Sequence, residues 1–232
     1  MTTLDRSKLG AILFEEEFSG ALDPTKWAFD LPWGVGGKDT HVITDDGSLN
    51  CFLPEAVSVA AGKASIRAVR SANVWGMPWI SGMIRTQQKF SQGCYVEVAA
   101  KLPAGAGLHS SVWLYGAQNE IDIIETLGQA PTVGYASIHY GPGEKLYKTF
   151  NFHRLDTSAK MINHGVLWTA AGFSFFQNDV WVGSLPTEPG MNVPMQILIT
   201  LAVGGNWAGV PDPEMISATL SVDHVRAYAV AE

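Results

Sequence analysis

The sequence predicts an all-β fold, a sandwich of two antiparallel sheets. Apolar and polar residues alternate with period two in many short segments, turns rich in Gly and Pro separate these segments at regular spacing, and helical periodicity is almost absent. Short, evenly spaced strands are typical of a two-sheet sandwich. Of 232 residues 47% are apolar and 16% charged, which is enough apolar material for one large core. We therefore expect a single domain over residues 1–232.

The strands expected within this sandwich follow one another along the whole chain. The opening run FEEEFSG and the closing run VDHVRAYAV both read as strands, which predicts that both ends are tied into the sheets. Between them the alternating segments are KASIRAVR, GCYVEVAAKLPAG, SVWLYG, EIDIIETLG, VGYASIHYG, GFSFFQND, VWVGSLP and MQILITLAVGG. The best local helical signal is a single turn at residues 23–26, which Asp23 would cap and Pro24 would begin.

Composition excludes several classes of partner. The formal net charge is -7 without a basic cluster, so we expect no nucleic-acid partner, because phosphate binding needs Lys and Arg gathered on one face. No segment approaches the length of a membrane span, so we expect no membrane partner, and the N-terminal MTTLDRSKLG has no apolar region typical of a signal peptide. Cys51 and Cys94 are too few for a disulfide framework, and we interpret both as free thiols.

The run EIDIIE, which begins at Glu120, is the candidate for chemistry. Its β-branched isoleucines favour a strand. On a regular strand Glu120 and Asp122 share one face, the isoleucines between them point to the other, and Glu125 falls on the wrong face. A β-bulge near Ile123 or Ile124 would bring Glu125 back beside Asp122, and bulges are common near active sites. The spacing therefore predicts a bulged strand with three acids on one face and the isoleucines beneath.

Two glutamates in this arrangement can work together. After the bulge their backbones stand about four strand positions apart, roughly 13 Å. Side chains that lean inward can close this towards the roughly 5 to 5.5 Å typical of retaining glycosidases. Asp122 can hydrogen-bond one glutamate while its charge raises the proton affinity of the other. Two alternatives stay open on the motif alone: a solvated acidic strand face, and a metal site with His109 or His139 as added ligand.

Segments in order along nearly the whole chain resemble glycoside hydrolase family 16, the laminarinase-like β-glucanases. FEEEFSGALDPTKW is similar to the opening strand and turn of that family, and SGMIRTQQKFSQGCYVEVAAKLPAGAGLHSSVWL to the long block before its catalytic strand. IHYG at 138–141, AVGGNWAG at 202–209 and VDHVRAY at 222–228 complete the series. The five-residue step from Glu120 to Glu125 resembles the bulged motif of laminarinases, agarases and carrageenases.

This resemblance implies a β-jelly-roll with a concave cleft that cuts internal β-1,3 or mixed β-1,3/1,4 linkages of a polysaccharide with retention. Glu120 would be the nucleophile, Glu125 the acid/base and Asp122 the supporting acid, without a cofactor for catalysis. That assignment requires a raised pKa for Glu125 and a low one for Glu120. A polymeric substrate implies a secreted or extracellular protein, and we expect a monomer.

The resemblance also suggests residues that contact the substrate: Trp113, His139, Trp207, Arg85 and Asn50. Trp113 matches a tryptophan that lines the cleft in the family, although an ordinary core position is about as well supported, and His139 read alone would be a structural histidine. Trp207 follows a Gly-Gly pair, which favours an exposed loop. Aromatic rings can form a flat platform for sugars. Three tryptophans in Gly- and Pro-rich loops could extend such a platform: Trp33, Trp75 and Trp79. Trp168 and Trp181, on apolar strands, are expected in the core.

The resemblance also implies a structural calcium on the outer face, because Glu17 and Asp223 match residues that can contribute to it in the family, with plain surface carboxylates as the alternative. The chain departs from the family at His109, Ser110 and Met83, which leaves the substrate open. An endoglycanase of a bacterial exopolysaccharide such as succinoglycan and a transglycosylase are therefore alternatives. A non-catalytic glucan-binding module is the alternative from another class, although all three acids are present here.

Overall fold

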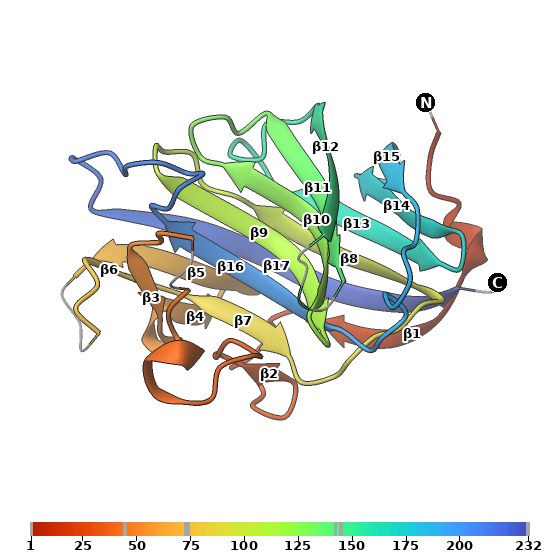
Figure 1. Cartoon of the computed structure of the whole chain (residues 1–232), viewed down its shortest axis with the longest axis horizontal. Coiled ribbons are helices and arrows are strands. Elements are labelled where there is room, and N and C mark those ends of the chain that lie inside the picture. Colours follow the sequence, from red (N-terminus) through yellow and green to blue (C-terminus); the bar gives the residue numbers. More distant parts are fainter. Residues whose placement is uncertain (1, 44–45, 72–74, 142, 144–145, 231–232) are drawn as a thin grey trace.

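The computed structural model describes residues 2–43, 46–71, 75–141, 143 and 146–230, and it consists of two stacked β-sheets (Figure 1). The seven-stranded sheet has the order β12 (Leu146–His153), β11 (Val133–Tyr140), β10 (Asn119–Leu127), β9 (Leu108–Gly116), β16 (Gln196–Val203), β7 (Met83–Thr86) and β2 (Trp27–Ala28). The ten-stranded sheet has the order β15 (Val180–Leu185), β14 (Gly172–Gln177), β13 (Ile162–Thr169), β8 (Cys94–Lys101), β17 (Ser217–Val230), β5 (Lys63–Arg70), β6 (Trp79–Ser81) and β3 (Asn50–Phe52).

Two further strands complete the larger sheet: β1 (Leu9–Glu16) pairs with β17, and β4 (Val57–Ala60) pairs with β5. The helical segments of the described residues are the short 3-10 turns η1 (Arg6–Lys8), η2 (Gly37–Thr40) and η3 (Pro54–Ala56). None of the helices described is long and apolar enough to cross a bilayer.

The predicted sandwich of antiparallel sheets is confirmed, and among the described strands β3 and β6 form a parallel pair. The segment KASIRAVR forms β5 and VDHVRAYAV lies within β17, whereas only the first three residues of FEEEFSG belong to β1, which starts earlier, at Leu9, and pairs with β17. The expected turn is also present: the Asp23 carboxylate accepts hydrogen bonds from the Thr25 N–H and hydroxyl, at 2.8 and 2.7 Å. Period-two alternation and turn chemistry were sufficient to place these elements.

Alternation along each strand decides what the two sheets bury between them. Val96 and Val98 of β8 face Ile121 of β10 and Ile197 and Ile199 of β16 across one continuous apolar core, in which all five are fully buried. Burying such a side chain stabilises the fold by about 1.5 to 3 kcal/mol each. The alternate residues of the seven-stranded sheet point away from the ten-stranded sheet, on what we call the open face.

A tight hairpin fixes the register of β9 against β10. Ala117 and Gln118 have positive φ of 47° and 63°, the left-handed conformation that a two-residue type I′ turn requires. Gly116 therefore pairs with Asn119, and Glu120 pairs with Tyr115. A register fixed at the turn carries along the strands, so every acid of β10 has a defined neighbour on β9.

Burial corrects two expectations about tryptophans. Trp79 does not extend an exposed platform, because it lies in β6 with 1% exposure and the Arg70 guanidinium sits 5.1 Å from its ring. Trp181 is not in the core: it is 45% exposed, because β15 is the edge strand of its sheet and this position points outward. Trp168 is fully buried as predicted, and Cys51 and Cys94 are buried free thiols, also as predicted.

Candidate active site

The β-bulge predicted in EIDIIE is confirmed. On β11, Glu120 pairs with His139 and Glu125 pairs with Tyr135, so five steps along β10 correspond to four along β11. The pairing with β9 shifts between Asp122 and Ile124, which makes Ile123 the extra residue. The isoleucines of the run are buried in the core between the sheets. The bulge thus returns Glu125 to the open face, on the same side as Glu120 and Asp122.

Because directly paired residues share a face, the side chains of the open face form three cross-strand rows, each centred on one acid of β10. The rows are Tyr147, His139, Glu120, Tyr115 and Gln196; then Thr149, Ser137, Asp122, Trp113, Leu198 and Arg85; then Asn151, Tyr135, Glu125, Ser111, Thr200 and Met83. The three acids are therefore surrounded by tyrosines, hydroxyls and a histidine supplied by the neighbouring strands.

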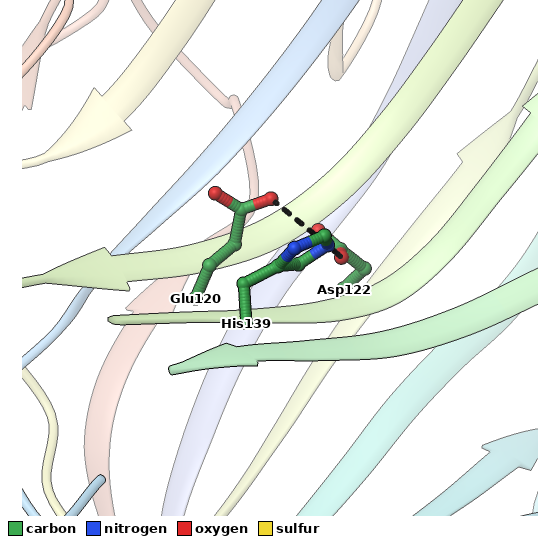
Figure 2. Close-up of side chains that lie close together, drawn as sticks. All are labelled: Glu120, Asp122 and His139. Atoms are coloured by element: carbon green, nitrogen blue, oxygen red, sulfur yellow. Dashed lines mark ion pairs between the residues drawn. The ribbon is translucent and has the colours of Figure 1, made fainter. Parts of the chain in front are cut away.

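Glu120, Asp122 and His139 converge from β10 and β11 (Figure 2). The His139 Nε2 lies 3.2 Å from Oδ2 of Asp122 and 3.9 Å from Oε1 of Glu120. The Asp122 side chain is only 2% exposed, whereas that of Glu120 is 27% exposed. Asp122 is therefore shielded by its neighbours, while Glu120 can be reached by a ligand.

Burial and a neighbouring acid disfavour the charged form of both Glu120 and Asp122. Burial raises the pKa of Glu120 well above its usual range, and the charge of Asp122 raises it further. Burial also raises the pKa of Asp122, together with the charge of Glu125. The expectation that Glu120 keeps a low pKa is therefore wrong, because this side chain lies beside a second, buried acid. Glu120 and Asp122 are best described as a pair that shares a proton.

Glu125 has its own partners, from β9. The His109 Nε2 lies 2.9 Å from Oε1 of Glu125 and 3.1 Å from the Ser111 hydroxyl. Both side chains of the His109–Glu125 pair are largely buried. The acid at each end of the site thus contacts a different histidine: His139 lies near Glu120, and His109 contacts Glu125.

Aromatic rings border the acids at both ends of the site. Near Glu120, the exposed Trp33 lies 4.9 Å from the ring of Tyr115 and 5.9 Å from that of Trp113. Trp113 itself is buried, and its Nε1–H donates to the Thr200 hydroxyl at 3.3 Å. Trp113 therefore forms the floor beside Asp122, while Trp33 offers an accessible ring.

At the other end the accessible ring is Trp207, as expected for a residue after a Gly-Gly pair. Its indole meets His109 at 5.0 Å and Tyr135 at 4.8 Å, in both cases edge to face. Trp75, which was expected to extend the aromatic platform, instead stacks at 6.2 Å on His41.

Two residues proposed as donors to sugar hydroxyls are occupied elsewhere. Asn50 is 0% exposed, and its Oδ1 accepts the Val203 N–H at 2.7 Å, so it links β3 to the end of β16 and does not face a ligand. Arg85 lies in the Asp122 row, but its guanidinium donates to the carboxylate and the carbonyl of Asp30 at 2.7 Å. Asn50 thus has a structural role, and Arg85 binds Asp30 beside the site.

Two groups of side chains were considered as sites for a cation, and the structure shows different surroundings for each. Glu17 accepts hydrogen bonds from Arg226, and Asp223 forms an ion pair with Lys63, so calcium at these carboxylates would have to displace both cations. Calcium binding there stays a prediction. Among the described residues, the His, Cys, Asp and Glu groups close enough to share an ion are Glu120, Asp122 and His139, whose ligand atoms lie within 4.8 Å of one another. A divalent cation would compete with substrate at this point.

The sequence interpretation missed the residues that surround Glu125. The sequence indicates His109 only as a possible metal ligand and as a departure from the family, and it does not single out Ser111 and Tyr135, which pair with Glu125, or Tyr115, which pairs with Glu120. A signal was present, because positions 109, 111, 113 and 115 share one face of a strand. Since that face also contains Trp113, the open face of β9 could have been inferred from the alternation alone.

Comparison with known proteins supports the same assignment of fold. A family model described as glycosyl hydrolases family 16 matches residues 35–220. The endo-1,3-1,4-beta-glycanase EglC of Rhizobium meliloti (strain 1021) is 29% identical over 98% of this chain and 53% of its own length. The glucan endo-1,3-beta-glucosidase A1 of Niallia circulans is 27% identical over 94% of this chain and 37% of its own length. The chain therefore spans about half or less of these two curated relatives.

Among solved structures, the catalytic domain of an endo-1,3-beta-glucanase (laminarinase) from Thermotoga petrophila RKU-1 superposes with a TM-score of 0.85 at 23% identity, over 96% of this chain and 98% of that chain. At this level of identity the likeness concerns the fold, and it confirms the predicted jelly-roll sandwich.

Proposed function

Because the chain belongs to glycosyl hydrolases family 16, we propose that it is a retaining endo-β-glycanase that hydrolyses internal β-1,3 or mixed β-1,3/1,4 linkages of a polysaccharide. The names of the relatives support this class of linkage. The observation that carries the proposal is the bulged strand β10, which puts three acids on the open face between the accessible rings of Trp33 and Trp207.

In the first step, Glu125 in its protonated form donates to the glycosidic oxygen while the ionised Glu120 attacks the anomeric carbon. The glycosidic bond breaks, the leaving sugar takes the proton, and an ester forms between the remaining sugar and Glu120. In the second step Glu125, now ionised, removes a proton from water, which opens the ester and regenerates both acids. Two displacements at one carbon give retention.

The raised pKa of Glu120 disfavours the ionised form that a nucleophile needs, and Asp122 can offset this effect. A nucleophile must be ionised, and two adjacent carboxyls hold one proton more readily than two negative charges. The hydrogen bond between the two carboxyls raises the pKa of Glu120 and lowers that of Asp122, whereas the deeper burial of Asp122 opposes its charge more strongly. We give burial the greater weight and assign the shared proton to Asp122. Its neutral carboxyl then leaves Glu120 as the anion, and the neighbouring His139 lowers the pKa of Glu120 and so favours that state.

Product analysis tests this function. We expect the purified protein to release oligosaccharides of mixed length from one of laminarin, mixed-linkage glucan, agarose, carrageenan and succinoglycan, as internal cleavage requires. Proton NMR of the early products should show the β-anomer first. Early α-anomer would exclude retention, and binding to these polymers without new reducing ends would favour a glucan-binding module. Longer products at high substrate concentration would indicate transglycosylation.

Replacing Asp122 by asparagine should stabilise the protein at neutral pH and slow it. A carboxyl with a raised pKa contributes stability that is present below its unfolded value of about 4 and is lost as the pH rises through the folded value. Asparagine cannot ionise, so we expect Tm to rise by about 2–4 °C at pH 7, equivalent to ~1 kcal/mol for a chain of this size, and to gain less near pH 4. Activity should fall by about 10- to 100-fold, because an amide N–H holds the Glu120 carboxylate more weakly than the hydroxyl of a neutral Asp122 does.

The matched control for this variant is Asp156→Asn. A hydrogen bond from Ser158 lowers the pKa of the Asp156 carboxyl, so the same substitution there should not raise Tm at pH 7. A Tm gain for Asp122→Asn that is equal at pH 4 and pH 7 would contradict the buried, mutually repelling pair. Thermal unfolding followed by circular dichroism at both pH values supplies the measurement.

Two further properties belong to the same proposal. A polymeric substrate is met outside the cell, so we expect an extracellular site of action. The open face is built from residues of one chain, so we expect a monomer to be sufficient for activity.

A further inference from the structure

The contact between His109 and Glu125 has no part in the reaction as set out above. His109 lies on β9, two residues before Ser111, which pairs directly with Glu125. The imidazole Nε2 lies 2.9 Å from Oε1 of Glu125, which is within hydrogen-bond distance. One oxygen of the Glu125 carboxyl is therefore engaged from β9.

The surroundings of His109 hold its ring in this orientation. The Trp207 indole packs edge to face on the imidazole at 5.0 Å, and the same indole packs on Tyr135, the residue paired with Glu125 on β11. The Ser111 hydroxyl lies 3.1 Å from the same Nε2. Ser111 of β9 and Trp207 of the loop after β16 thus contact the imidazole directly, and Tyr135 of β11 supports the Trp207 ring, so the Nε2 atom is fixed relative to the carboxyl.

We propose that His109 is a positioning residue for Glu125: its Nε2–H donates to Oε1 and so leaves Oε2 as the oxygen that carries and delivers the proton. This proposal rests on the role of Glu125 in the proposed function. A protonated carboxyl has one carbonyl-type oxygen, which accepts, and one hydroxyl, which donates. A donor fixed at Oε1 selects that oxygen as the acceptor.

The same hydrogen bond serves both steps. In the first step it directs the acidic proton to the oxygen that faces the substrate. In the second step the carboxyl is ionised, and the Nε2–H keeps donating to Oε1, now as a stronger, charge-assisted bond, while Oε2 receives the proton of water. No proton needs to leave the imidazole at any stage, so the role of His109 is orientation and not proton transfer.

The test compares two substitutions at position 109 on two kinds of substrate. His109→Phe keeps a ring against Trp207 but removes the donor, whereas His109→Gln restores an N–H near the position of Nε2. The substrates are the polysaccharide that the wild-type protein cleaves and a 2,4-dinitrophenyl glycoside of its oligosaccharide product. The phenolate leaves without a proton, so kcat/KM on it does not depend on acid assistance.

We expect His109→Phe to lower kcat/KM on the polysaccharide by about 10- to 100-fold, the value of a hydrogen bond to a charged group, and on the dinitrophenyl glycoside by less than about 3-fold. His109→Gln should recover most of the loss. The reference is Glu125→Gln, which should show the same dependence on the leaving group to a larger extent. The matched control is His153→Phe, the same change at an exposed histidine of β12.

Each result decides between the alternatives. An equal loss on both substrates, or none on either, would overturn the positioning role, and so would a glutamine variant as slow as the phenylalanine variant. If the wild-type protein cleaves nothing, the proposed function fails together with this inference; if Glu125→Gln shows the leaving-group dependence and His109→Phe does not, only the inference fails. Thermal unfolding monitors folding, and His109→Met provides a second apolar variant should His109→Phe not fold.

Discussion

Glu120→Gln is expected to reduce polysaccharide cleavage by about 10⁴-fold or more while the fold persists. Glutamine has the shape of glutamate but cannot act as the nucleophile, so the ester that divides the reaction into two steps does not form. The substitution also removes one of two adjacent acids whose charges repel, and the pKa of Glu120 is raised by burial and by that neighbour. We therefore expect Tm at pH 7 to stay constant or to rise, which separates lost chemistry from lost structure.

Reducing-sugar release and thermal unfolding measure the two effects, with Glu55→Gln as the control at an exposed position. Mass spectrometry adds direct evidence: a 2-fluoro glycoside should increase the mass of the wild-type protein by one glycosyl unit, located to Glu120. An adduct on Asp122, or near-wild-type activity of the glutamine variant, would contradict the assignment of the nucleophile.

The strands were predictable because each depends on local pattern. The segment KASIRAVR forms a strand with the same bounds, since period-two alternation needs only a core on one side. The bulge in β10 was predictable for a related reason: three acids and three isoleucines share six positions, and only an extra residue places the acids together and the isoleucines underneath. Sequence reasoning succeeds where one face has to be apolar.

Side-chain environments were harder to predict, because they depend on segments distant in the chain. Trp79 follows a Gly-Met-Pro loop but is covered as part of β6, while Trp181 looks like a core residue but lies on an edge strand. Asn50 is buried because Val203, far along the chain, supplies its hydrogen bond. The order of strands within the sheets decides these cases, and alternation does not encode that order.

The raised pKa of Glu120 was also hard to predict from sequence, because it depends on how the neighbouring strands bury this side chain and Asp122. The sequence puts Asp122 two residues after Glu120 and suggests that its charge acts on a glutamate. The low pKa expected for Glu120, however, follows only from its assignment as the nucleophile. Asp122 is buried between its cross-strand partners Ser137 and Trp113, and this burial makes the pair share a proton. The protonation state of Glu120 therefore depends on both carboxyls together, and their burial side by side follows from the assembled sheet.

Glu125→Ala is expected to lower kcat on the polysaccharide by about 10² to 10⁴-fold, the usual contribution of a general acid and base. The loss in kcat/KM should be far smaller for a dinitrophenyl glycoside, whose leaving group needs no proton. With that substrate the glycosyl ester accumulates, because no base activates water. Azide needs no base and fits the space that alanine leaves, so added azide should restore turnover.

The anomer of the glycosyl azide then assigns the two glutamates independently of any rate. In Glu125→Ala, azide attacks the ester formed on Glu120, and two displacements give the β-azide. In Glu120→Ala no ester forms, so azide attacks the substrate directly from the face of the missing nucleophile and gives the α-azide. Because the products are opposite, exchanged roles for Glu120 and Glu125 would exchange the anomers. The same azide from both variants would show that these residues do not form a retaining pair.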